Sequence, residues 1–125
     1  PFTPSGVLIK ALMISSAEQM SLYHGGGSAD IKLGIPPDNM QGFGRVQMNN
    51  VLPLKGVYDK TSLYVDDLRS ITPGQTIKYT VIVSTGSVPL RATLVWYDPP
   101  AVGGSTSKAL MHDLDLIVTT PSGNR

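Results

Sequence analysis

The sequence predicts an α+β chain, with a helix near its start and antiparallel strands toward its end. Three observations carry this prediction. Apolar residues fill most of residues 4–20, with only Lys10 strongly polar before Ser15. Residues 21–42 are dense in Gly, Pro, Asp and Asn. From residue 63 onward, apolar and polar residues alternate, which is the period of half-buried strands.

Composition indicates a globular chain and excludes several classes of function. Of the 125 residues, 41% are hydrophobic and 15% are charged, which is typical of folded domains. A net charge of +1 and scattered Lys and Arg residues do not favour a nucleic-acid partner. The absence of cysteine excludes disulfides and thiolate metal sites. No apolar run reaches the roughly 18 residues of a membrane span.

The first predicted element is a helix of the buried type. Thr3 suits the N-cap, and Pro4 suits the first helical position, where its missing N–H costs nothing. Apolar residues lie all round the helical wheel, and a helix without a polar face needs cover on several sides. The first half of the chain offers too little other structure to supply that cover. We therefore expect this region to fold poorly by itself.

The remaining elements follow in order along the chain. Residues 21–42 form a long irregular loop, and residues 44–52 form a short helix that ends before Pro53. A domain boundary near that proline separates residues 1–55 from residues 56–125. The second part contains four strands, with a type II turn built on Pro73 and Gly74 between the first two. The predicted strands are 63–68, 77–83, 90–97 and 114–119.

Two segments resemble the subtilisin-like serine proteases, in the branch of oxidatively stable alkaline proteases with a C-terminal β-sandwich. The segment Gln41-Gly42-Phe43-Gly44-Arg45-Val46 is similar to the one that closes subtilase catalytic domains. The other segment is similar to the C-terminal domain; its matching residues are Leu94, Val95, Trp96, Asp98, Pro99, Pro100, Asp113, Leu114, Asp115, Leu116, Pro121, Ser122 and Gly123. The helix at residues 4–17 also resembles one that follows the nucleophilic serine in this family.

The resemblance implies a fold and a parent activity. Residues 1–55 would be the C-terminal helix region of a subtilase α/β catalytic domain. Residues 56–125 would be the first half of an antiparallel jelly-roll β-sandwich, which needs about eight strands. The chain would thus be a fragment, cut at both ends, of a secreted serine endopeptidase that hydrolyses protein or peptide substrates. Its partner would be the remainder of the same protease.

No catalytic residue is assigned. None of the three motifs that carry the Asp/His/Ser triad of the family occurs here. His112 and Asp113 are neighbours on an expected strand, so their side chains point to opposite faces and cannot pair. His24 and Ser28 flank a triple glycine, but Asp30 stands where a Gly-x-Ser-x-Gly elbow needs glycine. The fragment is expected to be structural and inactive alone.

Asp98, Asp113 and Asp115 are the candidate metal ligands, with calcium as the expected cofactor. Carboxylates on loops at a sandwich edge suit a cation that prefers oxygen, and the resembling domain contains calcium sites. The alternative is a solvated polar face, with Asp98 capping a turn before Pro99. The acidic pairs Asp38-Asn39 and Asp66-Asp67 are weaker candidates.

A binding module is the alternative function. Trp96 and Tyr97 would then form a sugar-stacking platform on a jelly-roll domain that recognises carbohydrate or protein. Alternation instead places Trp96 with Leu94 and Ala92, which favours the sandwich core. A purely structural, calcium-stabilised domain is the third possibility.

Overall fold

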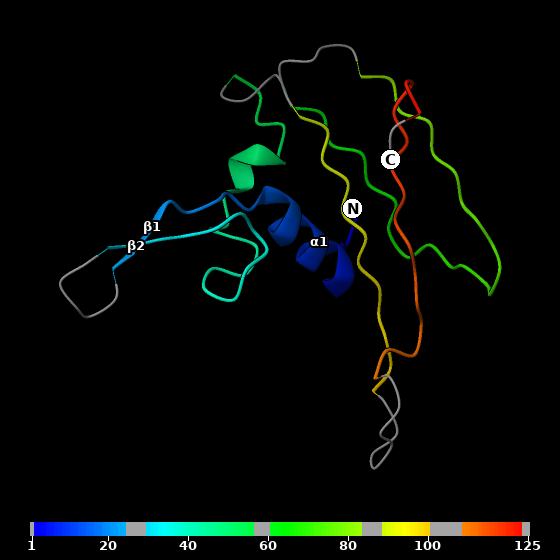
Figure 1. Ribbon diagram of the computed structural model, residues 1–125. Helices are drawn as coiled ribbons and strands as arrows, with labels where there is room; N and C mark the ends of the chain where they lie inside the picture. Colours follow the sequence, from blue (N-terminus) through cyan, green and yellow to red (C-terminus); the bar gives the residue numbers. More distant parts are fainter. Residues whose placement is uncertain (1, 25–29, 57–60, 84–88, 101–108, 124–125) are drawn as a thin grey trace.

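The computed structural model describes residues 2–24, 30–56, 61–83, 89–100 and 109–123. Four regular elements lie in these ranges, and all precede residue 51. They are helix α1 (Gly6–Ser16), strands β1 (Leu22–His24) and β2 (Asp30–Lys32), and the 3₁₀ helix η1 (Met48–Asn50). Figure 1 shows α1 between the β1–β2 hairpin and the extended segments 61–83, 89–100 and 109–123.

Helix α1 confirms the predicted helix but is shorter at both ends. Its N-cap is Ser5, whose Oγ accepts the amide proton of Leu8 at 3.1 Å. Thr3 was therefore the wrong cap, because Ser5 reaches the third amide of the helix, the usual partner of a capping hydroxyl. The helix ends at Ala17, which is extended with ψ 140°. Beyond it the chain turns away to pair with Arg45.

The predicted irregular loop at 21–42 contains a hairpin that the sequence analysis missed. Strands β1 and β2 pair antiparallel, with Leu22 opposite Lys32 and Tyr23 opposite Ile31. Gly, Pro, Asp and Asn are frequent in this region, which favoured the prediction of a loop. The two strands have only three residues each, too few to show an alternating pattern. Ser28, a weak candidate nucleophile, lies outside the described residues.

The apolar core of the described residues is very small. Leu33 and Val51 are its buried hydrophobic members, at 6% and 4% exposed. Helix η1 packs against α1, and Asn50 donates through Nδ2 to the carbonyl of Ser16 at 3.0 Å. The short helix predicted at 44–52 is thus present only as the three residues of η1. Polar contacts, not apolar burial, fix this region.

The predicted jelly-roll sandwich is wrong. Residues 61–83, 89–100 and 109–123 are extended, yet none of them belongs to a strand. The only sheet in the described part of the chain is the two-stranded β1–β2 hairpin. Alternation of apolar and polar residues predicts which side chains share a face, but it does not create the backbone hydrogen bonds that define a sheet. The chain is therefore not a helix region followed by a sandwich.

The predicted type II turn is confirmed, and a second turn lies at residues 120–123. The amide of Gln75 donates to the carbonyl of Thr72 at 3.0 Å, with Gly74 at φ +77° as a type II turn requires. The amide of Gly123 donates to the carbonyl of Thr120 at 2.9 Å. Turn chemistry is local, so it forms without the ladder that the sandwich would need.

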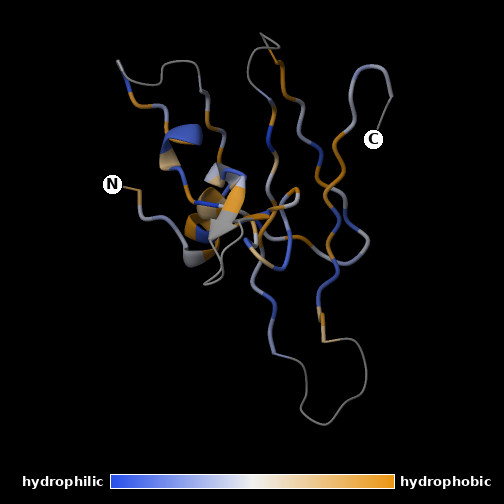
Figure 2. Cartoon of the chain, turned by 60° about the vertical axis from the view of Figure 1, so that its left-hand side comes forward, coloured by the Kyte–Doolittle hydropathy of each residue, from blue (hydrophilic) through white to orange (hydrophobic). Residues whose placement is uncertain are grey.

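Helix α1 has no complete apolar cover. Ile9 and Met13 on it are 48% and 47% exposed, and Ser16 is its one buried residue. Figure 2 shows hydrophobic segments distributed along the extended part of the chain as well as on α1. None of the helices in the described ranges combines the length and the apolar character needed to cross a bilayer.

Gly44 marks a close approach between two backbones. Its φ is +104°, and a Cβ built there would lie 2.2 Å from the carbonyl oxygen of Glu18. Gly42, at φ +59°, has open space around the same position. Both glycines adopt a backbone conformation that L-residues avoid, but only Gly44 also excludes a side chain by contact.

We expect Gly44→Ala to destabilise the N-terminal region more than Gly42→Ala. The control carries only the left-handed backbone penalty of about 1–2 kcal/mol, whereas Gly44→Ala adds an overpacking cost of about 1–3 kcal/mol. Urea denaturation followed by far-UV circular dichroism measures both. Equal unfolding midpoints for the two variants would contradict the contact between Gly44 and Glu18.

Candidate functional site

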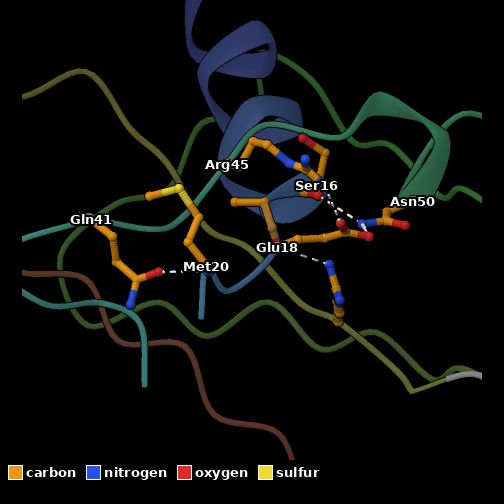
Figure 3. Close-up of polar contacts among 8 residues, drawn as sticks. Ser16, Glu18, Met20, Gln41, Arg45 and Asn50 are labelled. Carbon is orange, nitrogen blue, oxygen red and sulfur yellow. Dashed lines mark hydrogen bonds and ion pairs between the residues drawn. The ribbon is translucent and has the colours of Figure 1, made fainter. Parts of the chain in front are cut away.

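The described residues form a polar cluster around the C-terminal end of α1. We call it the Gln41 cluster, and its members are Ser16, Glu18, Met20, Gly34, Asp38, Gln41, Arg45 and Asn50. Figure 3 shows six of them converging from the chain after α1, the loop before Arg45 and helix η1. The segment at residues 41–46 supplies Gln41 and Arg45.

Gln41 is the centre of this cluster and is only 9% exposed. Its Oε1 accepts the amide proton of Met20 at 2.9 Å. Its Nε2 donates to the carbonyl of Gly34 at 2.9 Å and to Asp38 Oδ2 at 2.8 Å. A buried amide needs partners for both its oxygen and its nitrogen, and Gln41 has them. It therefore has a structural role.

Asp38 organises the turn that presents Gln41. Its Oδ1 accepts amide protons from Met40 at 2.8 Å and from Gln41 at 2.9 Å, and its backbone exchanges two hydrogen bonds with Gly42. The side-chain hydrogen bond from Gln41, followed by these amides, lowers the pKa of Asp38. The carboxylate oxygens of Asp38, which was a weak candidate for metal binding, thus accept hydrogen bonds from N–H groups.

Glu18 links the chain after α1 to Arg45 and Asn50. The backbones of Glu18 and Arg45 exchange two hydrogen bonds of 2.8 Å each, and Arg45 Nη2 lies 3.2 Å from Glu18 Oε2. Asn50 Nδ2 donates to Glu18 Oε1 at 3.0 Å. The hydrogen bond from Asn50, and then that from Arg45, lowers the pKa of Glu18. The ion pair is exposed, so the backbone bonds and Asn50 matter more.

This cluster has no arrangement for nucleophilic chemistry. Ser16 is fully buried, and its hydroxyl donates to the carbonyl of Met13 at 2.9 Å. A serine nucleophile needs a general base within hydrogen-bond reach and access to substrate, and Ser16 has neither among the described residues. The contacts of the cluster hold neighbouring backbones together.

The predicted calcium ligands lie on the extended segments after residue 89. Both carboxylate oxygens of Asp98 accept amide protons, from Met111 and from His112, at 2.9 Å each. These bonds, led by that from Met111, lower the pKa of Asp98. In the described ranges no three His, Cys, Asp or Glu side chains form a group that suits a metal ion. A calcium site that includes Asp113 and Asp115 stays a prediction.

His112 pairs with Asp98, a contact that the sequence analysis missed. His112 Nδ1 lies 2.9 Å from Asp98 Oδ1, and the histidine side chain is 59% exposed. The sequence analysis tested His112 only against its neighbour Asp113. A hairpin pairing of residues 90–97 with 114–119 would have supplied the signal, because it would bring residues 98 and 112 to the same end. No nucleophile adjoins this pair among the described residues.

The aromatic candidates for sugar stacking do not form a platform. Trp96 is half-buried, and its Nε1 is shielded from solvent without a hydrogen-bond partner among the described residues. Tyr97 is 78% exposed. A stacking platform needs exposed ring faces side by side, whereas Trp96 is half-buried and Tyr97 is exposed.

Comparisons with known proteins identify no relative: no protein family, curated protein or solved structure matches the chain.

The lowered pKa values of Glu18 and Asp38 predict acid sensitivity of the Gln41 cluster. A carboxylate whose pKa is lower in the folded state stabilises that state above its unfolded pKa, about 4. The contribution is lost as the pH falls through the lowered folded value. We expect urea midpoints to be constant from pH 7 to about 5 and to fall below about 4. Asp38→Asn is expected to flatten this fall, whereas Asp115→Asn, outside the cluster, leaves it unchanged.

The calcium hypothesis is tested by thermal unfolding with excess calcium and with a chelator. If Asp98, Asp113 and Asp115 hold the ion, calcium raises the midpoint, since a ligand that binds only the folded state stabilises it. Asp115→Ala should remove the increase, whereas Asp66→Ala should not. An unchanged midpoint for the unmodified chain would remove the hypothesis.

Proposed function

We propose that this chain is a structural, non-catalytic segment of a subtilisin-like serine endopeptidase. The resemblance of residues 41–46 to the closing segment of subtilase catalytic domains is the first support. The contacts of this segment are the second support. Gln41, Gly44 and Arg45 each contact the chain that follows α1, as expected of a segment that anchors a helix.

The amount of exposed surface is the observation that carries the proposal. The chain has a solvent-accessible surface of 10574 Å². A folded monomer of 13.3 kDa has about 6,500 Å². The excess of about 4,000 Å² is several times the roughly 800 Å² that one partner contributes to a standard interface. A transient partner is therefore too small to cover it, and a larger body of the same protein fits better.

Part of the exposed surface is apolar, as expected of a surface that packs against the remainder of a larger protein. Helix α1 has apolar residues on every side and two half-exposed ones, Ile9 and Met13. Phe43, within the subtilase-like segment, is 52% exposed. Apolar surface of this extent is normally buried against protein. The remainder of a subtilase catalytic domain would cover α1 in the manner that its all-apolar character requires.

The parent enzyme would hydrolyse peptide bonds of protein substrates through an acyl-enzyme. Its serine would attack the carbonyl carbon while its histidine moved the protons. The present chain would contribute packing behind that site and none of the reacting groups. By the same resemblance the parent would be secreted. A binding module on a jelly-roll is not proposed, because its fold is not present here.

Antibodies raised against this chain provide the test. We expect them to capture, from the source organism, a protein much larger than 13.3 kDa that reacts with a fluorophosphonate serine-hydrolase probe. The chain alone should not react, since it lacks the triad. Pretreatment with phenylmethylsulfonyl fluoride, which sulfonylates the catalytic serine of a serine hydrolase and releases fluoride, should block this labelling and is the control for reaction at the nucleophile. A captured protein that does not react with the probe would overturn the proposal.

A further inference from the structure

Two charged residues from the second half of the chain hold the two ends of α1. At the N-terminal end, Asp67 accepts two hydrogen bonds from Ser5. The amide of Ser5 donates to Oδ2 at 3.0 Å, and its hydroxyl donates to Oδ1 at 2.6 Å. The same hydroxyl accepts the amide proton of Leu8. Asp67 therefore holds the Ser5 side chain in the orientation in which it caps the helix.

At the C-terminal end, Arg91 takes the complementary position. Its Nη1 donates to the carbonyl of Ser15 at 2.9 Å and to that of Ala17 at 3.3 Å. Carbonyls in the last turn of a helix have no partner within the helix. Arg91 therefore satisfies groups that would otherwise rely on water.

The signs of the two charges match the helix dipole. A carboxylate is favoured at the N-terminus of a helix and a guanidinium at the C-terminus. The 11 residues of α1 span about 16 Å, so Asp67 and Arg91 contact opposite ends of one rod. They come from different extended segments, residues 61–83 and 89–100, and Figure 1 shows the latter passing beside α1.

We propose that Asp67 and Arg91 act together as one latch that docks the segments 61–83 and 89–100 onto α1. The Arg91 contact is exposed and the Asp67 contact is only partly buried, so each is weak alone. Once one has formed, the other partner is held nearby at high effective concentration, so the second contact forms at little further entropic cost. Opening either end therefore weakens the other. This inference does not depend on the proposed protease function.

The test reads each end of α1 after a change at the other end. Asp67→Ala is expected to shift the ¹³C carbonyl resonances of Ser15 and Ala17 toward their values in Arg91→Gln. Arg91→Gln is expected to speed hydrogen exchange of the Leu8 amide roughly two- to fivefold, the range that suits an exposed charged contact. The double variant should give less than the product of the two single effects on that exchange rate.

Matched controls separate the latch from general loosening. Asp66→Ala removes the acceptor of the 2.5 Å hydrogen bond from Tyr79 but no contact with α1, and it should change neither readout. Arg69→Gln is the matched control for Arg91→Gln: it removes a guanidinium from the same half of the chain, and it should change neither readout. Unchanged Ser15 and Ala17 carbonyls in Asp67→Ala, or multiplicative effects in the double variant, would overturn the latch.

A salt titration of the unmodified chain covers the case in which a variant loses α1 altogether. Salt screens exposed charged contacts. The latch requires the Leu8 exchange rate and the Ala17 carbonyl resonance to change over the same range of salt concentration. Two separate ranges would show that the contacts are independent and would overturn the proposal.

Discussion

Helix α1 is held by hydrogen bonds at its ends and not by burial of its sides. Ser5 and Asp67 satisfy the first turn, while Arg91 and Asn50 satisfy carbonyls near the last. The sides, where the free energy of folding normally arises, remain partly in water. These polar ends set where α1 lies relative to η1 and to the segments 61–83 and 89–100.

The segment at residues 41–46 shows how a short motif can have structural roles at several of its positions. Gln41 bridges three backbone or side-chain groups, and Gly44 lets its own backbone approach that of Glu18. Arg45 then pairs with Glu18 through backbone and side chain. The motif brings the strand-like residues before η1 across the end of α1. A catalytic role is not needed to explain any of these residue types.

Sequence reasoning succeeded where the determinant is local. The hydrogen bonds within the helix at residues 6–16 and within the turn at Thr72–Gln75 join neighbours no more than four positions apart, and both elements are present. It failed where the determinant is distant. Alternation in residues 77–83 and 90–97 predicted a sandwich, but pairing depends on partners far along the chain, and no ladder forms.

The candidate site follows the same division. Asp98 was expected to cap a local turn or to bind an ion, and its partners prove to be Met111 and His112, more than ten residues away. Without a fold, the sequence shows only which residues are adjacent in the chain. The prediction for His112 therefore considered only its neighbour Asp113. Gln41 was recognised as part of a motif, but its bond to Met20 spans 21 positions and gave no signal in the sequence.

The composition and the exposed surface of this chain are at odds, and the conflict has a physical resolution. A disordered chain is poor in hydrophobic residues and rich in charge, whereas this one is 41% hydrophobic and 15% charged. A globular chain of that composition buries most of its large side chains, whereas here Leu33 and Val51 are the buried apolar residues of the described ranges. Both statements hold together if the apolar side chains are complementary to surfaces outside these 125 residues. The polar contacts at the ends of α1 and in the Gln41 cluster then set the orientation in which the apolar faces are presented.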